Sequence, residues 1–185
     1  MCGLIRKSAV LLSILTLLPL ASASAERKDV PLILMDTGTF AFIPPGDPNA
    51  TSADLEGTGV STHLGKIVST GLFEKEDRPS GGFKGKIQGT ATAVLNETAT
   101  ATASPSPSPT ASPTASPSPI PDTIRYRLSA EFSPDASGIF YGIGTYLITG
   151  GTGKFKRARG VGVFIGLADF EGATYNCFLR GTISY

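Results

Sequence analysis

Apolar and polar residues alternate with a period of two over most of the chain after residue 26. In residues 124–132 every even position is apolar and every odd position is polar. This period is typical of a strand with one buried face and one wet face. Residues 83–95 and 175–185 repeat the pattern, and no segment has the periodicity of an ordinary amphipathic helix. The chain is therefore predicted to be all-β.

The pattern and the turn-forming residues between its runs define candidate strands. They cover residues 30–35, 39–43, 60–73, 83–95, 124–132, 137–149, 160–170 and 175–185. Long, glycine-rich strands joined by short turns favour an antiparallel barrel, because closure leaves no strand edge unpaired. We predict a single antiparallel eight-stranded barrel of the kind found in calycins and allene oxide cyclases. An open sandwich is the alternative.

The first 25 residues differ from this pattern. Arg6 and Lys7 precede an apolar run over residues 9–20, and small residues follow at 21–25. That order is typical of a cleaved secretory signal peptide. The run is too short to span a bilayer comfortably, since a transmembrane helix needs about 20 apolar residues. We expect cleavage after Ala25 or Ala23, a secreted (extracellular or periplasmic) protein, and no integral membrane segment afterwards. A retained membrane anchor is the alternative.

A second unusual segment, residues 99–121, consists mainly of Ser, Thr, Ala and Pro. Proline lacks a backbone donor and the segment has almost nothing apolar to bury, so we predict a disordered, solvent-exposed loop. The segments 26–98 and 120–185 are each near or below the size at which one core is self-sufficient. We therefore expect one domain over residues 26–185, interrupted by this loop, whose closure entropy grows only slowly with length.

Charge and cysteine content exclude several classes of protein. Loss of residues 1–25 would remove Arg6 and Lys7, which changes the formal net charge from +1 to −1, and would leave Cys177 as the only cysteine. A single cysteine cannot form an internal disulfide. A near-neutral chain lacks the basic surface of a nucleic-acid-binding protein, so no such partner is predicted. The sole histidine, His63, has no partner Cys or His for a usual zinc site, and no cofactor motif is present.

A glycine-rich stretch over residues 148–160 joins two predicted strands. Its glycines supply the positive φ angles of a tight hairpin turn, and we expect Phe155 to pack back onto the barrel end while Lys154 and Lys156 point outward. The helix that a nucleotide-binding loop requires is missing, because residues 161–165 are alternating and rich in valine and isoleucine. We interpret the stretch as a structural turn motif consisting of Gly150, Gly151, Gly153, Phe155, Arg159 and Gly160.

This turn, Gly150-Gly151-Thr152-Gly153-Lys154-Phe155 followed by Ala158-Arg159-Gly160, resembles one in dirigent proteins and, more loosely, in allene oxide cyclases. The match covers residues 140–185. Residues 61–66 resemble a segment of secreted bacterial barrels of uncharacterised function that share the turn. The resemblance implies an eight-stranded barrel with an internal cavity for a small apolar molecule, and self-association. It does not imply a reaction, because the matching positions are structural in both families.

Some polar side chains are candidates for lining such a cavity. Asp36 follows the apolar residues 32–35, and Asp169 ends the alternation over 161–167 on the same face. Acids near a barrel mouth can have raised pKa values, although turn caps are commoner. His63 and strand tyrosines are the other candidates, although strand aromatics usually fill a core. The predicted ligand-binding residues are His63, Asp36, Tyr126, Tyr146 and Asp169, and no catalytic residue is assigned.

Three functions agree with these patterns. We favour a non-enzymatic secreted barrel that binds a small apolar ligand, because no catalytic group, cofactor motif or metal set is assembled. The first alternative is a dirigent-like or allene-oxide-cyclase-like guide or isomerase that shapes a reactive intermediate. The second is a structural surface or matrix protein. A cavity of a few hundred cubic ångströms that contains Asp, His or Arg would favour the guide or isomerase, and a purely apolar cavity would favour binding. A barrel filled by its own side chains would favour the structural protein.

Overall fold

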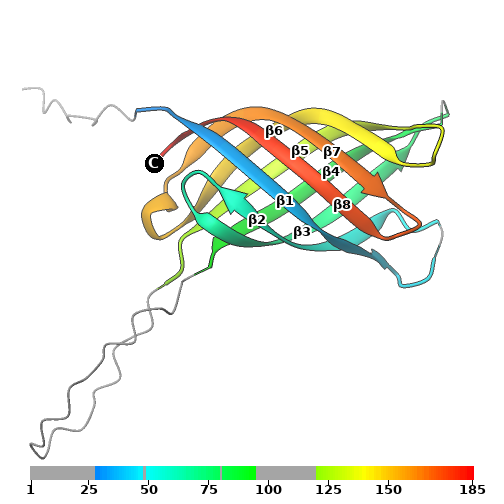
Figure 1. Cartoon of the computed structure of the whole chain (residues 1–185), viewed down its shortest axis with the longest axis horizontal. Coiled ribbons are helices and arrows are strands. Elements are labelled where there is room, and N and C mark those ends of the chain that lie inside the picture. Colours follow the sequence, from blue (N-terminus) through cyan, green and yellow to red (C-terminus); the bar gives the residue numbers. More distant parts are fainter. Residues whose placement is uncertain (1–27, 48, 80, 95–119) are drawn as a thin grey trace, which may run out of the picture.

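The computed structural model describes residues 28–94 and 120–185, except residues 48 and 80, so the predicted signal peptide and most of the Pro-rich tract lie outside the described residues. Eight strands close into a barrel in which each strand is antiparallel to its neighbours in chain order (Figure 1). The predicted fold class is confirmed. The elements are β1 Val30–Ile43, β2 Ser52–Ser61, β3 Gly65–Asp77, β4 Phe83–Ala93, β5 Thr123–Pro134, β6 Phe140–Thr152, the short 3-10 helix η1 Gly153–Phe155, β7 Arg159–Asp169 and β8 Thr174–Ser184.

The predicted strand boundaries were wrong in the first half of the barrel. Residues 30–35 and 39–43 belong to one strand, β1, which pairs with β8 through Gly38 without a break. Residues 60–73 are not one strand but span the end of β2, a turn and most of β3. The start of β2 was missed because its inward positions include Gly57 and Gly59, so its apolar alternation is weak. The prediction divided β1 into two strands and joined parts of β2 and β3 into one, so the predicted number of strands was still eight.

Side chains alternate between the interior and the outer surface along every strand. In β1, Leu32, Leu34 and Phe40 are buried while Ile33 and Met35 are exposed. The inward side chains form one continuous apolar core along the barrel. The register of the strands therefore determines which side chains can meet in the interior, because a slip of one residue would exchange the two faces.

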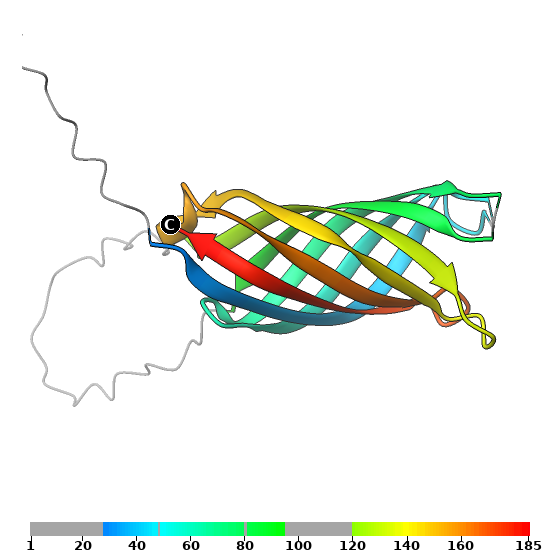
Figure 2. The same cartoon turned by 90° about the horizontal axis from the view of Figure 1, so that it is seen from above.

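One end of the barrel, here called the plug end, is closed by the glycine-rich turn. The C-terminus, the β2–β3 turn and the β6–β7 connection lie at this end (Figures 1 and 2). The Phe155 side chain in η1 is fully buried, and its ring centroid lies 4.6 Å from that of Tyr185. Lys154 and Lys156 are exposed, as predicted. β6 continues to Thr152, so Gly150 and Gly151 are strand residues and η1 makes the turn.

The opposite end, here called the aromatic end, is closed by phenylalanine rings. Their contacting pairs have centroids 4.9–5.8 Å apart, mostly in edge-to-face arrangements. The rings come from both halves of the chain: Phe40, Phe42, Phe83, Phe140 and Phe170. Three of them, Phe42, Phe140 and Phe170, are only partly buried. The aromatic end is therefore less tightly sealed than the plug end.

Within residues 28–94 and 120–185, no helix has the length and apolar character needed to cross a membrane. The only helical element in these residues is η1, with three residues.

Candidate functional site

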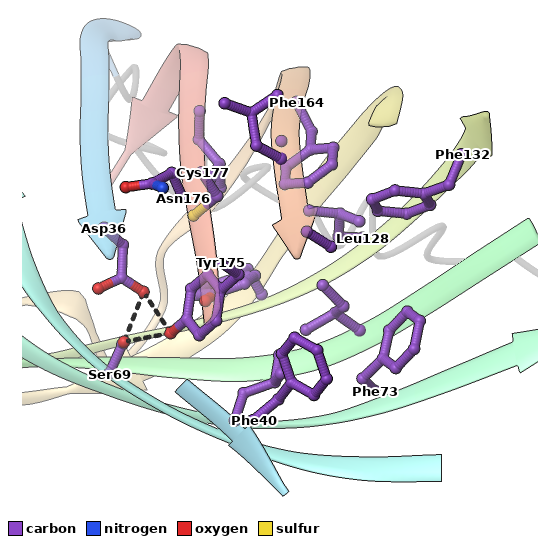
Figure 3. Close-up of a pocket in the computed structure, with 18 of the residues that line it drawn as sticks. Asp36, Phe40, Ser69, Phe73, Leu128, Phe132, Phe164, Tyr175, Asn176 and Cys177 are labelled. Carbon is purple, nitrogen blue, oxygen red and sulfur yellow. Dashed lines mark hydrogen bonds between the residues drawn. The ribbon is translucent and has the colours of Figure 1, made fainter. Parts of the chain in front are cut away.

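A narrow cavity lies inside the barrel, between its middle and the aromatic end. Figure 3 shows side chains that line it. The cavity leaves about 50 Å³ for the centre of a water-sized sphere. One water needs about 10–15 Å³ by this measure, so the space suits a few water molecules or a very small organic group. Most of the barrel interior is filled by its own side chains. The wall is largely apolar and includes Leu55, Phe73, Leu128, Phe132, Phe164 and Leu179.

A group of polar side chains, here called the Asp36 cluster, interrupts this apolar wall. It consists of Asp36 on β1, Ser69 on β3, Tyr126 on β5, and Tyr175 and Cys177 on β8. Figure 3 shows the centre of the cluster. The Ser69 hydroxyl donates to Asp36 Oδ2 at 2.5 Å, and the Tyr175 hydroxyl donates to the same oxygen at 3.0 Å. The two hydroxyl oxygens lie 3.4 Å apart.

The second carboxyl oxygen of Asp36, Oδ1, differs from Oδ2 in its hydrogen bonding. Asp36 Oδ1 is buried and has no hydrogen-bond partner among the described residues. Leaving a buried acceptor unpaired costs about 1–3 kcal/mol. Gly57 on the neighbouring strand makes room for the cluster, because a Cβ atom at this position would lie 2.8 Å from Asp36 Oδ1 and would also press on the Tyr175 hydroxyl. The chain therefore maintains space beside a carboxyl oxygen that it does not itself satisfy.

Burial controls the protonation of the cluster. Desolvation raises the pKa of Asp36 above its usual value, and the hydrogen bonds from Ser69 and Tyr175 only partly oppose this. Burial likewise raises the pKa of Cys177 to about 12 and the pKa of Tyr126 well above its usual value. The thiol therefore stays protonated near neutral pH and is not an activated nucleophile.

The arrangement fixes where a proton on Asp36 would reside. Oδ2 already accepts two hydrogen bonds, so protonation occurs on Oδ1. In that form Asp36 can donate one hydrogen bond to an acceptor, and in the ionised form Oδ1 can accept one. The site can therefore bind a hydroxyl or carbonyl group or hold a proton beside an apolar molecule.

The structure brings two of the five predicted ligand-binding residues, Asp36 and Tyr126, together at the cavity. Tyr146 also points into the barrel, but it lies nearer the plug end and does not line this cavity. Its buried hydroxyl has no partner among the described residues and lies 2.7 Å from the position of a Cβ atom on Gly181. Tyr146 therefore fills the core beside glycines.

His63 and Asp169 lie away from the cavity. His63 is in the β2–β3 turn at the plug end, where its Nε2 atom is 2.8 Å from the Pro31 carbonyl oxygen. Asp169 shares a face with Val161, as the alternation indicated, but that face is the outer one. Its Oδ1 atom accepts hydrogen bonds from the backbone N–H groups of Glu171 and Gly172, both at 3.0 Å. Asp169 therefore caps a turn.

Sequence reasoning missed Ser69 and gave no special weight to Tyr175. Ser69 alternates in phase with Ile67 and Phe73, so the sequence contains the signal that it points inward. Its contact with Asp36 is not visible in the sequence, because β2 lies between β1 and β3 in the barrel. Only the curvature of the closed sheet brings these two side chains within hydrogen-bond distance.

Within the described part of the chain, no group of three or more His, Cys, Asp and Glu side chains is arranged to hold a metal ion. Comparisons of the chain with models of protein families, with curated proteins and with solved structures found no match. The interpretation of the Asp36 cluster therefore depends on its own geometry and chemistry.

Proposed function

We propose that the barrel binds a small, largely apolar molecule in its interior, with the Asp36 cluster as the polar end of the site. The observation that carries this proposal is the unpartnered, buried Oδ1 atom of an acid at the wall of an otherwise apolar cavity. An apolar side chain at position 36 would avoid the cost of burying that atom. A ligand with one hydroxyl or carbonyl group would offset it.

The size of the cavity restricts the ligand. About 50 Å³ is far below the roughly 300–1,000 Å³ of pockets for drug-sized molecules. A molecule with a ring enters only if side chains at the aromatic end rotate. We place the entry there because Phe42, Phe140 and Phe170 are only partly buried, whereas Phe155 at the plug end is fully buried. The ligand is therefore slender, apolar and at most about one ring wide.

Phenol and toluene form a matched pair of probes for this proposal. Both are single rings, and only phenol has a hydroxyl group. We expect both to raise the melting temperature of the protein and to shift the NMR signals of cavity residues such as Phe73 and Leu128. Phenol should bind about tenfold more tightly, since one hydrogen bond to a buried group contributes about 1.4 kcal/mol. Native mass spectrometry of the purified chain, followed by denaturation and extraction, would identify any molecule already bound.

Control variants separate cavity binding from binding elsewhere. Leu55→Phe narrows the cavity and should abolish both sets of shifts, while Leu55→Met conserves the side-chain volume and should retain them. The proposal would be refuted if neither probe, at saturating concentration, shifted the NMR signals of cavity residues and if native mass spectrometry found no molecule bound to the purified chain. A structural surface or matrix role would then explain the filled barrel better.

The Asp36 cluster also favours a second function, a dirigent-like guide or an allene-oxide-cyclase-like isomerase. The supporting observation is the raised pKa of Asp36, which makes it a proton donor or acceptor inside an apolar site. Such a protein would change the stereochemistry of products formed from a phenoxy radical or a reactive fatty-acid epoxide. Chiral chromatography with wild type and with Asp36→Asn tests this. A racemic product with wild type would exclude the guide and leave simple binding.

A further inference from the structure

The outer surface of the barrel has two different faces. On β4 and β5 the outward positions are charged or polar, and include Lys84, Lys86, Gln88, Arg125, Arg127, Ser129 and Glu131. On β6, β7 and the first half of β1 many outward positions are large and apolar, and β8 adds Phe178 between the polar Asn176 and Arg180. This surface, with Val60 at its edge on β2, is called the apolar face, and consists of Ile33, Met35, Val60, Tyr141, Ile143, Leu147, Val161, Val163, Ile165, Leu167 and Phe178.

The strand register aligns the apolar face into a continuous row. Ile143 on β6 pairs with Ile165 on β7, which pairs with Phe178 on β8. Phe178 pairs with Met35 on β1, which pairs with Val60 on β2. Five neighbouring strands thus place apolar side chains side by side across the outside of the barrel. Cross-strand neighbours of this kind pack against one another, so they form one surface and not scattered single residues.

The exposed area of this face is that of a protein interface. Nine of its side chains are between 38% and 69% exposed: Ile33, Met35, Val60, Tyr141, Ile143, Leu147, Val161, Val163 and Ile165. At on the order of 80 Å² each, they present about 700 Å², close to the roughly 800 Å² per partner of a standard interface. Monomeric proteins rarely expose contiguous apolar patches larger than a few hundred Å².

We propose that the apolar face binds a second copy of this chain. A partner of different sequence is usually selected by complementary charge, and among the outward positions of the central rows only Arg180 is charged. Rows of valine and isoleucine on two such faces interdigitate as in two packed sheets, about 10 Å apart. In an isologous contact the same surface of both copies meets, so that surface must be complementary to itself. A nearly uncharged face with side chains of similar size meets this requirement.

Self-association through the apolar face and ligand binding in the interior involve different side chains. Ile165 and Ile143 point outward, and neither lines the cavity of the Asp36 cluster. Substitutions at Ile165 or Ile143 therefore change self-association without removing a cavity side chain. The polar face on β4 and β5 remains free in the assembly.

The test measures the mass of the full chain in solution. The chain is expressed with its N-terminal segment, so that any processing takes place, and is examined by light scattering after size exclusion from about 1 to about 100 µM. We expect a mass of at least two chains that decreases on dilution. Ile165→Lys should raise the dissociation constant about 30-fold or more. Leu72→Lys, the same kind of change at an exposed position on the outer face of β3, should alter it by less than about threefold.

Each outcome supports or overturns the proposal. A wild-type mass of one chain at all concentrations overturns it, and binding of that monomer to phosphatidylglycerol vesicles would assign the face to a membrane surface instead. An assembly that persists in Ile165→Lys overturns the assignment of the surface. If Ile165→Lys does not fold, Ile165→Thr serves instead, because threonine suits a strand and still removes apolar area. Dissociation of either folded variant, with Leu72→Lys unchanged, supports the proposal.

Discussion

Replacing Phe155 by alanine tests whether the glycine-rich turn closes the core at the plug end. The side chain is fully buried and packs against the Tyr185 ring at a centroid distance of 4.6 Å. Phe→Ala substitutions in cores cost about 3–5 kcal/mol, and the cost is largest where the site cannot collapse. Gly151, on β6 next to the Cβ atom of Phe155, is fixed by pairing with β5. We therefore expect a loss of about 4 kcal/mol in the free energy of unfolding.

A phenylalanine-to-alanine substitution at the aromatic end, Phe170→Ala, provides the control. Phe170 is only partly buried and packs among phenylalanines that can shift toward the space it leaves. Removing its ring forfeits less burial and leaves a smaller cavity, so we expect a loss of at most about 2 kcal/mol. The two variants differ in the position of the ring and not in the chemistry of the change.

Urea denaturation followed by tyrosine fluorescence and circular dichroism measures both losses. The midpoint should decrease while the slope of the free energy with urea concentration stays the same, because the surface exposed on unfolding is nearly unchanged. A loss below about 1.5 kcal/mol for Phe155→Ala, or an equal loss for Phe170→Ala, would refute the reasoning. The turn would then be a surface connection and not a plug.

Two further predictions concern Asp36 and the turn glycines. Burial raises the pKa of Asp36 in the folded protein above its pKa in the unfolded chain. Asp36 therefore contributes most to stability at pH values below the unfolded pKa, and this contribution is lost as the pH rises through the folded pKa. The stability of wild type relative to Asp36→Asn should therefore decrease from about pH 4 upward, measured as the difference between their melting temperatures; a difference independent of pH would contradict this. Gly153→Ala should cost about 2–3 kcal/mol, since φ is +54° and a Cβ atom would displace the Asp122 carboxylate, whose Oδ1 atom accepts a hydrogen bond from the Lys154 N–H. Gly65→Ala, with φ of +70° and no atom near the Cβ position, should cost only about 1 kcal/mol in the same urea assay, and equal losses would exclude this displacement.

Much of the fold was predictable because its signals are local. Alternation over residues 124–132 identifies β5 and its buried face from neighbouring residues alone. The glycines of the turn, with Phe155 after them, identified a hairpin and the residue that packs on the barrel end. The boundaries of β2 were not predictable, because glycines at inward positions remove the apolar residues on which the pattern depends.

The candidate site was predictable only in part, for a physical reason. The position of Asp36 after an apolar run identified it as a candidate, and Asp169 satisfied a similar rule. Both continue an alternation, but alternation separates two faces without saying which is inside. The closed register assigns Asp36 to the interior and Asp169 to the outer surface. The two acids therefore have different roles despite similar sequence contexts.

The sequence by itself determined the all-β class and the hairpin at the glycine-rich turn, since these follow from the period of two and from backbone conformation. It favoured a closed barrel over an open sandwich, and the structure decided between them. The tertiary structure alone decided that Ser69, Tyr175 and Asp36 meet, and that apolar side chains of β6, β7, β8 and β1 form a continuous row across the outside of the barrel. Both depend on residues far apart in the chain that become neighbours through strand pairing and barrel closure. No local pattern contains that information.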